Sequence, residues 1–187
     1  MTPTLYLTAV PTDSAVPAGS ADSADSADAA GAPPTIFTPA APLRIPLGAG
    51  LAAAVHDTDG PADRELTTDD LVARDATAGM LWDAAATAML TTLGRLTAVH
   101  GPALRRRRVP DLGGDVWEIA VVDDPFPATG LVAHPRLARH THRVLTAAGI
   151  PRIAVSGTRL LALGPDAAPA AGPVGLDIST GYCLQTV

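Results

Sequence analysis

Apolar side chains recur at helical spacing over residues 78–96, and this pattern limits the folds that are open to the chain. At about 100° per residue, a helix collects these side chains on one face. That face carries Trp82, Ala85, Ala86, Met89, Leu93 and Leu96. The opposite face carries Asp83, Thr87, Thr91 and Arg95. We expect the apolar face to pack on a sheet, with Trp82, Met89 and Leu93 buried, because the alternative, a surface for a partner helix, needs a long exposed apolar stripe.

The rest of the chain predicts strands and a second long helix. Pro135 suits a first helical position and Gly149 the position after a helix, so we expect a helix over 135–148. A shorter helix is predicted near 67–73. Strands are predicted at 5–10, within 42–57 and at 128–133, and hairpins at 103–109 with 116–122 and at 152–156 with 159–163. The expected fold class is α+β, with a mixed or antiparallel sheet packed against two main helices.

Length favours a single domain over residues 1–187. Residues 11–41 are rich in Pro, Ala, Ser, Asp and Gly and repeat the triplet Ala-Asp-Ser, which predicts a disordered or irregular insertion, a long low-complexity loop. The alternative for this segment is an acidic docking linker. Residues 164–173 predict a flexible linker, and 174–187 predict a tail that adds one edge strand at 176–178.

Charge and cysteine content narrow the class of partner and the compartment. The formal net charge is -6, which opposes binding to nucleic acid and to anionic membranes. The one cysteine, Cys183, has no partner for an internal disulfide. The N-terminus lacks a positively charged segment, and no apolar run approaches the roughly 18 residues of a membrane helix. We therefore expect a cytoplasmic protein without a membrane partner, and leave a protein partner open.

Arginines form the sharpest local feature and the candidate anion-binding residues. All 13 basic residues are Arg, and four of them are adjacent: Arg105, Arg106, Arg107 and Arg108. A second set, Arg136, Arg139 and Arg143, falls on one stripe of the second helix. The functional interpretation is that both sets converge on an anion or an RNA backbone. The alternative is a charged edge strand that resists aggregation, together with a solvated helix face; no aromatic residues are interleaved for base stacking.

His56 and Asp57 form the candidate polar site. The doublet resembles that of metal-dependent phosphohydrolases, but the further His and Asp ligands cannot be placed in this sequence. A turn over residues 56–61 is the alternative, because Asp, Gly and Pro dominate it. No metal site is expected, since His140 and His142 point about 200° apart on a helix and His134 is no better placed.

No catalytic or cofactor motif is complete. Ser156 lacks the first Gly of the G-x-S-x-G nucleophile motif, and Cys183 has no identifiable His partner. There is no phosphate-binding loop and no dinucleotide fingerprint. We therefore assign no catalytic residue and no cofactor.

The order of elements from Leu51 to Leu163 resembles the YtpQ-like family of uncharacterised bacterial proteins. A strand at 51–56 precedes Leu-Thr-Thr-Asp-Asp-Leu at 66–71 and an Ala-rich helix, and residues 153–163 resemble that group's closing hairpin. The usual Asn in the helix is missing, and Ser-Gly-Thr replaces a turn that contains Pro. The group has no established activity, so the resemblance implies an order of elements and no mechanism.

Two functions follow as hypotheses. The first is a non-enzymatic binding or accessory module. The second is a small hydrolase that acts on an anionic substrate near His56, Asp57 and the arginines. An active site needs its acid and base groups in one pocket, so convergence of these residues separates the two hypotheses.

Overall fold

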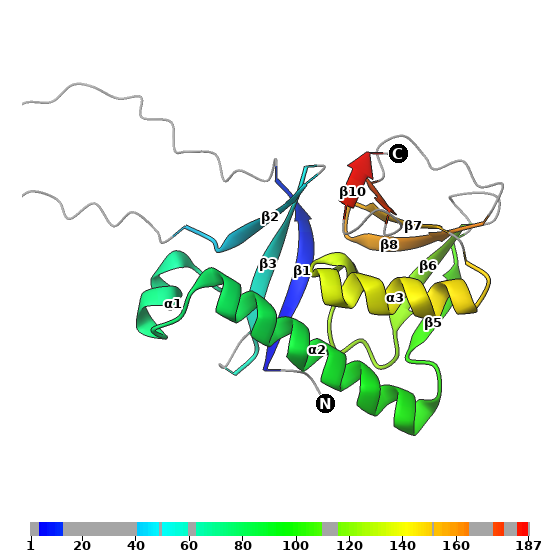
Figure 1. Cartoon of the computed structure of the whole chain (residues 1–187). Helices are drawn as coiled ribbons and strands as arrows, with labels where there is room; N and C mark the ends of the chain where they lie inside the picture. Colours follow the sequence, from blue (N-terminus) through cyan, green and yellow to red (C-terminus); the bar gives the residue numbers. More distant parts are fainter. Residues whose placement is uncertain are drawn as a thin grey trace, which may run out of the picture.

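Two antiparallel sheets and two long helices build the described part of the chain, so the predicted α+β class is confirmed (Figure 1). The structure is a computed structural model. It describes residues 4–12, 41–48, 50–59, 63–109, 116–150 and 152–164, and, as backbone only, 174–177 and 183–186. Residues 13–40 of the predicted insertion and 165–173 of the predicted linker lie outside the described residues.

The first sheet is built around β3 (Leu51–Asp57), which has β1 (Leu5–Pro11) on one side and β2 (Arg44–Gly48) on the other. Within residues 42–57 we expected one strand, and there are two. Gly48 and Gly50 flank the reversal with φ values of 98° and 72°, a conformation that glycine adopts without steric cost. Strand β3 is buried from Leu51 to Val55 because neighbouring strands and a helix cover it.

The second sheet holds six strands in the order β10-β9-β7-β8-β6-β5. Their bounds are β5 Leu104–Arg108, β6 Val116–Val121, β7 Arg152–Ser156, β8 Arg159–Leu163, β9 Val174–Asp177 and β10 Cys183–Thr186. Both predicted hairpins, β5 with β6 and β7 with β8, are confirmed. The predicted edge strand at 176–178 is wrong in its place: β9 pairs with β7 and β10, and β10 forms the edge.

Three α-helices connect the strands of the described chain. Strand β4 (Arg64–Glu65) leads into α1 (Thr68–Ala73), whose first turn is closed by a capping box between Thr67 and Asp70. Helix α2 (Ala78–His100) extends one turn beyond the predicted end, and α3 (Pro135–Ala147) begins at the predicted proline. None of the described helices is long and apolar enough to cross a membrane.

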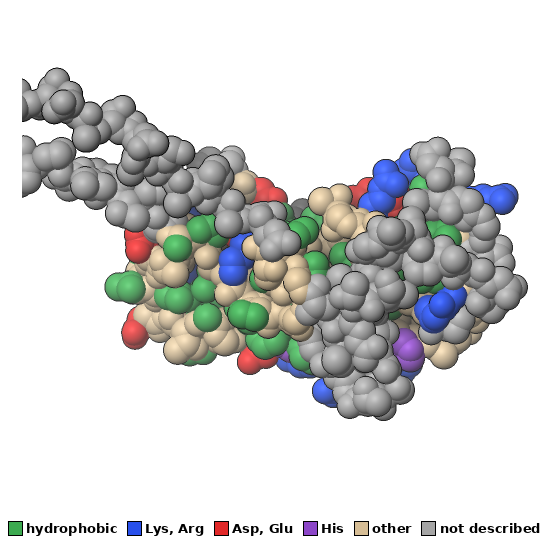
Figure 2. Space-filling view, turned by 90° about the horizontal axis from the view of Figure 1, so that it is seen from above, with side chains coloured by type: hydrophobic (Ala, Val, Ile, Leu, Met, Phe, Trp, Pro, Cys, Tyr) green, Lys and Arg blue, Asp and Glu red, His purple; other side chains and the backbone are tan. Residues whose placement is uncertain are grey.

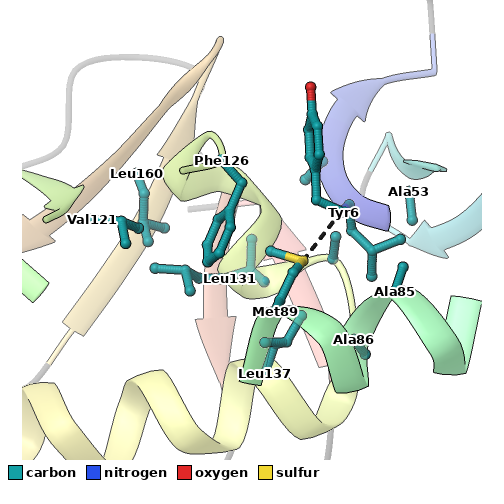
Figure 3. Close-up of a cluster of buried hydrophobic side chains, with 14 of the residues drawn as sticks. Tyr6, Ala53, Ala85, Ala86, Met89, Val121, Phe126, Leu131, Leu137 and Leu160 are labelled. Carbon is teal, nitrogen blue, oxygen red and sulfur yellow. Dashed lines mark hydrogen bonds between the residues drawn. The ribbon is translucent and has the colours of Figure 1, made fainter. Parts of the chain in front are cut away.

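The core lies between the helices and the sheets. Met89 of α2 points at β1, where its sulfur accepts a hydrogen bond of 3.2 Å from the backbone N–H of Leu7 (Figure 3). Met89 and Leu93 are buried, as predicted. Trp82 was expected to be buried and is only partly so; its indole Nε1 donates to the carbonyl oxygen of the buried Ala133 at 2.7 Å.

Residues 128–133 do not form the strand that we expected. They form the 3-10 helix η2 (Ala128–Val132), with Gly130 N–H bonded to the Pro127 carbonyl and Ala133 N–H to the Gly130 carbonyl. A short apolar run does not distinguish a buried strand from a buried helix. Gly130 favours the helical turn at this place, because the absence of a Cβ lets η2 lie directly against the backbone of Leu7.

Candidate functional site

A polar cluster surrounds His56 on the first sheet. Tyr6 is the direct cross-strand partner of His56, and the two rings stack with centroids 4.7 Å apart. The Oγ1 of Thr8 lies 3.0 Å from Nε2 of His56, and Oδ1 of Asp63 lies 3.7 Å from Nδ1. The Tyr6 hydroxyl donates a hydrogen bond to Asp63. The residues Tyr6, Thr8 and Asp63 were not predicted as part of this site.

Protonation in this cluster follows from burial. Burial lowers the pKa of His56 below its ordinary value of 6.5, so the imidazole is neutral at pH 7. Burial and the neighbouring Asp63 carboxylate raise the pKa of Tyr6, so its hydroxyl keeps its proton. A neutral His between a carboxylate and a hydroxyl has the order of groups of a nucleophile, base and orienting acid. Thr8, however, is buried, so substrate has little access to its hydroxyl.

Asp57 belongs to a different surface from His56. Neighbouring residues of a strand point to opposite faces, and both residues lie within β3 rather than in the turn proposed as the alternative. The Asp57 carboxylate is buried, pairs with Arg74, and accepts a hydrogen bond of 2.8 Å from the N–H of Asp59. Its oxygens are thus used to fix the segment after β3, and the His-Asp doublet does not form one site.

An open groove of about 620 Å³ lies beside the cluster. Its lining consists of Thr4, Tyr6, Thr58, Asp59, Asp63, Asp124, Pro125, Phe126 and Pro127. Three of these side chains are carboxylates, which oppose the entry of an anion. Among the described residues, no group of three His, Cys, Asp or Glu side chains is placed to hold a metal ion.

The four adjacent arginines do not line this groove and lie on the outer strand β5 of the second sheet. All four are exposed, as we predicted for an edge strand. Arg106 places its guanidinium 5.5 Å from the centre of the Trp117 ring on β6. No ion pair of these four arginines with another described side chain is present, so their charges face solvent.

The arginines of α3 form a separate set. Arg136, Arg139 and Arg143 are exposed, and Arg136 donates to Oγ1 of Thr87 on α2 at 3.2 Å. On the face seen in Figure 2, the basic side chains lie apart from one another rather than in one patch. The two sets lie on different elements, β5 and α3, and their convergence on one anion stays a prediction.

His134 caps the start of α3. Its Nδ1 accepts a hydrogen bond of 3.1 Å from the N–H of Arg136, and its Nε2 lies 2.9 Å from Oδ1 of Asp83. Because Nδ1 is an acceptor, the ring proton sits on Nε2 and is donated to Asp83. Burial lowers the pKa of His134 despite the opposing effect of Asp83. The residue is therefore a structural cap that needs a neutral ring.

We expect the free energy of unfolding to fall as the pH is lowered through about 6.5. The unfolded chain takes up a proton at the ordinary pKa of His134, whereas the folded chain takes it up only at lower pH, so acid favours the unfolded state. The loss from this residue by pH 5.5 is at most about 1.4 kcal/mol, because that pH lies about one unit below the unfolded pKa. Urea unfolding measures this loss when the free energies at pH 7.5 and pH 5.5 are compared, since these values lie about one unit either side of the ordinary pKa.

His134→Asn is the matched control for this prediction, since Asn also accepts at a cap but does not titrate. Burial also lowers the pKa of His56 and of His140, so the variant keeps a part of the acid sensitivity. An equal loss of stability in the variant and in the original protein would contradict the assignment to His134.

Comparisons with protein-family models, with curated proteins and with solved structures found no match to this chain. The resemblance to the YtpQ-like family therefore stays a prediction. The site has to be interpreted from its own geometry.

Proposed function

We propose that this chain is a non-enzymatic binding module of the cytoplasm that acts through a protein partner. The observation that carries the proposal is the separation of its reactive groups. His56 is stacked on Tyr6 in the first sheet, Asp57 is paired with Arg74, and the arginines of β5 line the edge of the other sheet. Groups that must act together in catalysis are instead used in separate contacts.

The electrostatics of the groove support the same proposal. An enzyme that acts on an anion needs positive charge beside its reacting groups. The groove beside His56 is lined by Asp59, Asp63 and Asp124, and none of its described lining residues is basic. An anionic substrate in that groove meets repulsion, and the arginines that were expected to attract it are on other elements.

One observation favours the second candidate, a hydrolase. Asp63, His56 and Thr8 are arranged as an acid, a base and a hydroxyl, with 3.0 Å between the last two. In that function His56 would take the proton of the Thr8 hydroxyl during attack on an ester. Two features weigh against it: Thr8 is buried, and neither Thr8 nor His56 lines the groove.

The test compares hydrolysis by the original protein with that by His56→Gln and Thr8→Val. The substrates are the nitrophenyl esters of acetate and of phosphate, one neutral and one anionic. We expect no rate above the buffer blank for any of the three proteins. A rate that both substitutions abolish, in variants that keep their melting temperature, would falsify the binding proposal and establish the hydrolase.

A further inference from the structure

We propose that strand β5 binds an acidic, extended segment of a partner protein, which adds to the edge of the second sheet as a further strand. This inference rests on the proposed binding function and names the surface and the chemistry of the partner. It depends on three properties of Leu104–Arg108. The strand has backbone groups that face away from β6, its arginines point alternately to the two faces of the sheet, and these arginines are exposed.

The backbone of β5 offers hydrogen-bonding groups on its outer side. Among the described strands, β5 is the last of the sheet and pairs with β6 alone. The N–H of Val122 donates to the carbonyl of Ala103, and the same register continues along the two strands. In an antiparallel pair the bonded positions alternate, so Arg105 and Arg107 face β6 and the N–H and C=O groups of Arg106 and Arg108 face outward.

The arginine side chains supply the selectivity for charge. Arg106 and Arg108 stand on one face of the sheet and Arg105 and Arg107 on the other, because side chains alternate along a strand. An added strand places its own side chains beside them on both faces. Carboxylates at consecutive positions of that strand therefore find a guanidinium on either face, and each pair forms charge-assisted hydrogen bonds.

The same features disfavour a nucleic acid as the occupant. Single-stranded nucleic acids bind where aromatic rings stack on the bases. The aromatic ring next to the arginines is that of Trp117, which is half-buried and already covered by Arg106. The net charge of -6 also repels a long polyanion, whereas a short acidic peptide meets only the local field of β5.

The experiment measures binding of a fluorescent octapeptide, in which pairs of Glu alternate with pairs of Val so that each face carries carboxylates, to the full chain by anisotropy. One control is the same peptide with every amide N-methylated, which keeps all charges and removes the N–H donors. Another is a short oligothymidylate with the same number of charges. We expect the Glu-Val peptide to bind about tenfold more tightly than its N-methylated form, since two or three backbone hydrogen bonds are lost.

Variants of the protein locate the site. Arg106→Gln with Arg108→Gln should weaken peptide binding about tenfold or more, with a loss that shrinks as salt rises. The matched control is Arg139→Gln with Arg143→Gln, which removes the same charge from α3 and should leave affinity nearly unchanged. Both double variants should keep their melting temperature, because exposed charges contribute little to stability.

A proline distinguishes backbone pairing from charge. Arg106→Pro removes the outward N–H in addition to the guanidinium, and an edge strand tolerates Pro where the N–H faces solvent. We expect Arg106→Pro to bind the peptide more weakly than Arg106→Gln. If Arg106→Pro lowers the melting temperature, the comparison with the N-methylated peptide still decides the question.

Several results would overturn the inference. Equal binding of the N-methylated peptide would mean that β5 is a patch for any anion, and tighter binding of the oligothymidylate would make it a nucleic-acid surface. Absence of binding by all three probes would leave β5 as an edge that only resists aggregation. Each of these leaves the non-enzymatic proposal standing, since that proposal fails only on hydrolysis that depends on His56 and Thr8.

Discussion

Leu93→Ala is expected to lower the free energy of unfolding by about 2–5 kcal/mol. Leu93 lies in the middle of the buried face of α2 and is 1% exposed. Truncation removes apolar atoms from the core and leaves a cavity that the surrounding backbone of two sheets and two helices cannot fill. Urea unfolding, followed by circular dichroism, gives the difference.

Val99→Ala is the control for this prediction. Val99 lies on the same helix but is 74% exposed, so its truncation should change stability by no more than about 0.5 kcal/mol. A cost near zero for Leu93→Ala as well would mean that the face of α2 is open in solution. That face would then be the surface for a partner, and the packing described above would be wrong.

Local sequence signals were enough to predict where the long helices begin, where α3 ends and which side chains of α2 are buried, with one exception. Pro135 marks the start of α3, and Gly149, with a φ of 78°, follows its end. The apolar period placed Met89 and Leu93 in the core. The exception is Trp82, whose ring has an apolar body and a polar Nε1. That nitrogen donates to the carbonyl of the buried Ala133 while the ring stays partly exposed, and periodicity alone does not contain this information.

Long-range register explains why the polar cluster could not be predicted. His56 was singled out, but Tyr6 and Thr8 stand on a strand about fifty residues before it in the sequence. Only the pairing of β1 with β3 brings Tyr6 opposite His56. A shift of one residue in that register would turn Tyr6 to the other face. The composition of neither strand determines the register.

The alternation of side chains along a strand was enough to predict that the arginines of β5 are exposed, but not how they lie relative to those of α3. Four adjacent charges cannot be buried on both faces of a strand, so an exposed edge was predicted and is found. Whether these arginines converge with Arg136, Arg139 and Arg143 depends on how α3 is placed relative to the edge of the second sheet. Such placement depends on the packing of the whole core, and no local pattern encodes it.

Gly130→Ala is expected to destabilise the fold by about 1–3 kcal/mol or more. A Cβ at this position would overlap the carbonyl oxygen of Leu7 and lie 2.8 Å from Cε of Met89. The methionine tip can move, but the Leu7 carbonyl belongs to a buried strand and cannot. The φ of Gly130 is not positive, so alanine is not strained by its own backbone. The expected loss of stability therefore measures the close contact between η2 and β1.

Gly94→Ala is the matched control and should have the opposite sign. Gly94 lies inside α2 and is exposed, and nothing lies within 4 Å of an added Cβ. Alanine there should raise the free energy of unfolding by up to about 1 kcal/mol, since glycine is the poorer helix former. Stabilisation by both substitutions would show that η2 stands away from β1. Opposite signs would establish that a buried glycine, rather than an apolar period, joins the segment 128–132 to the first sheet.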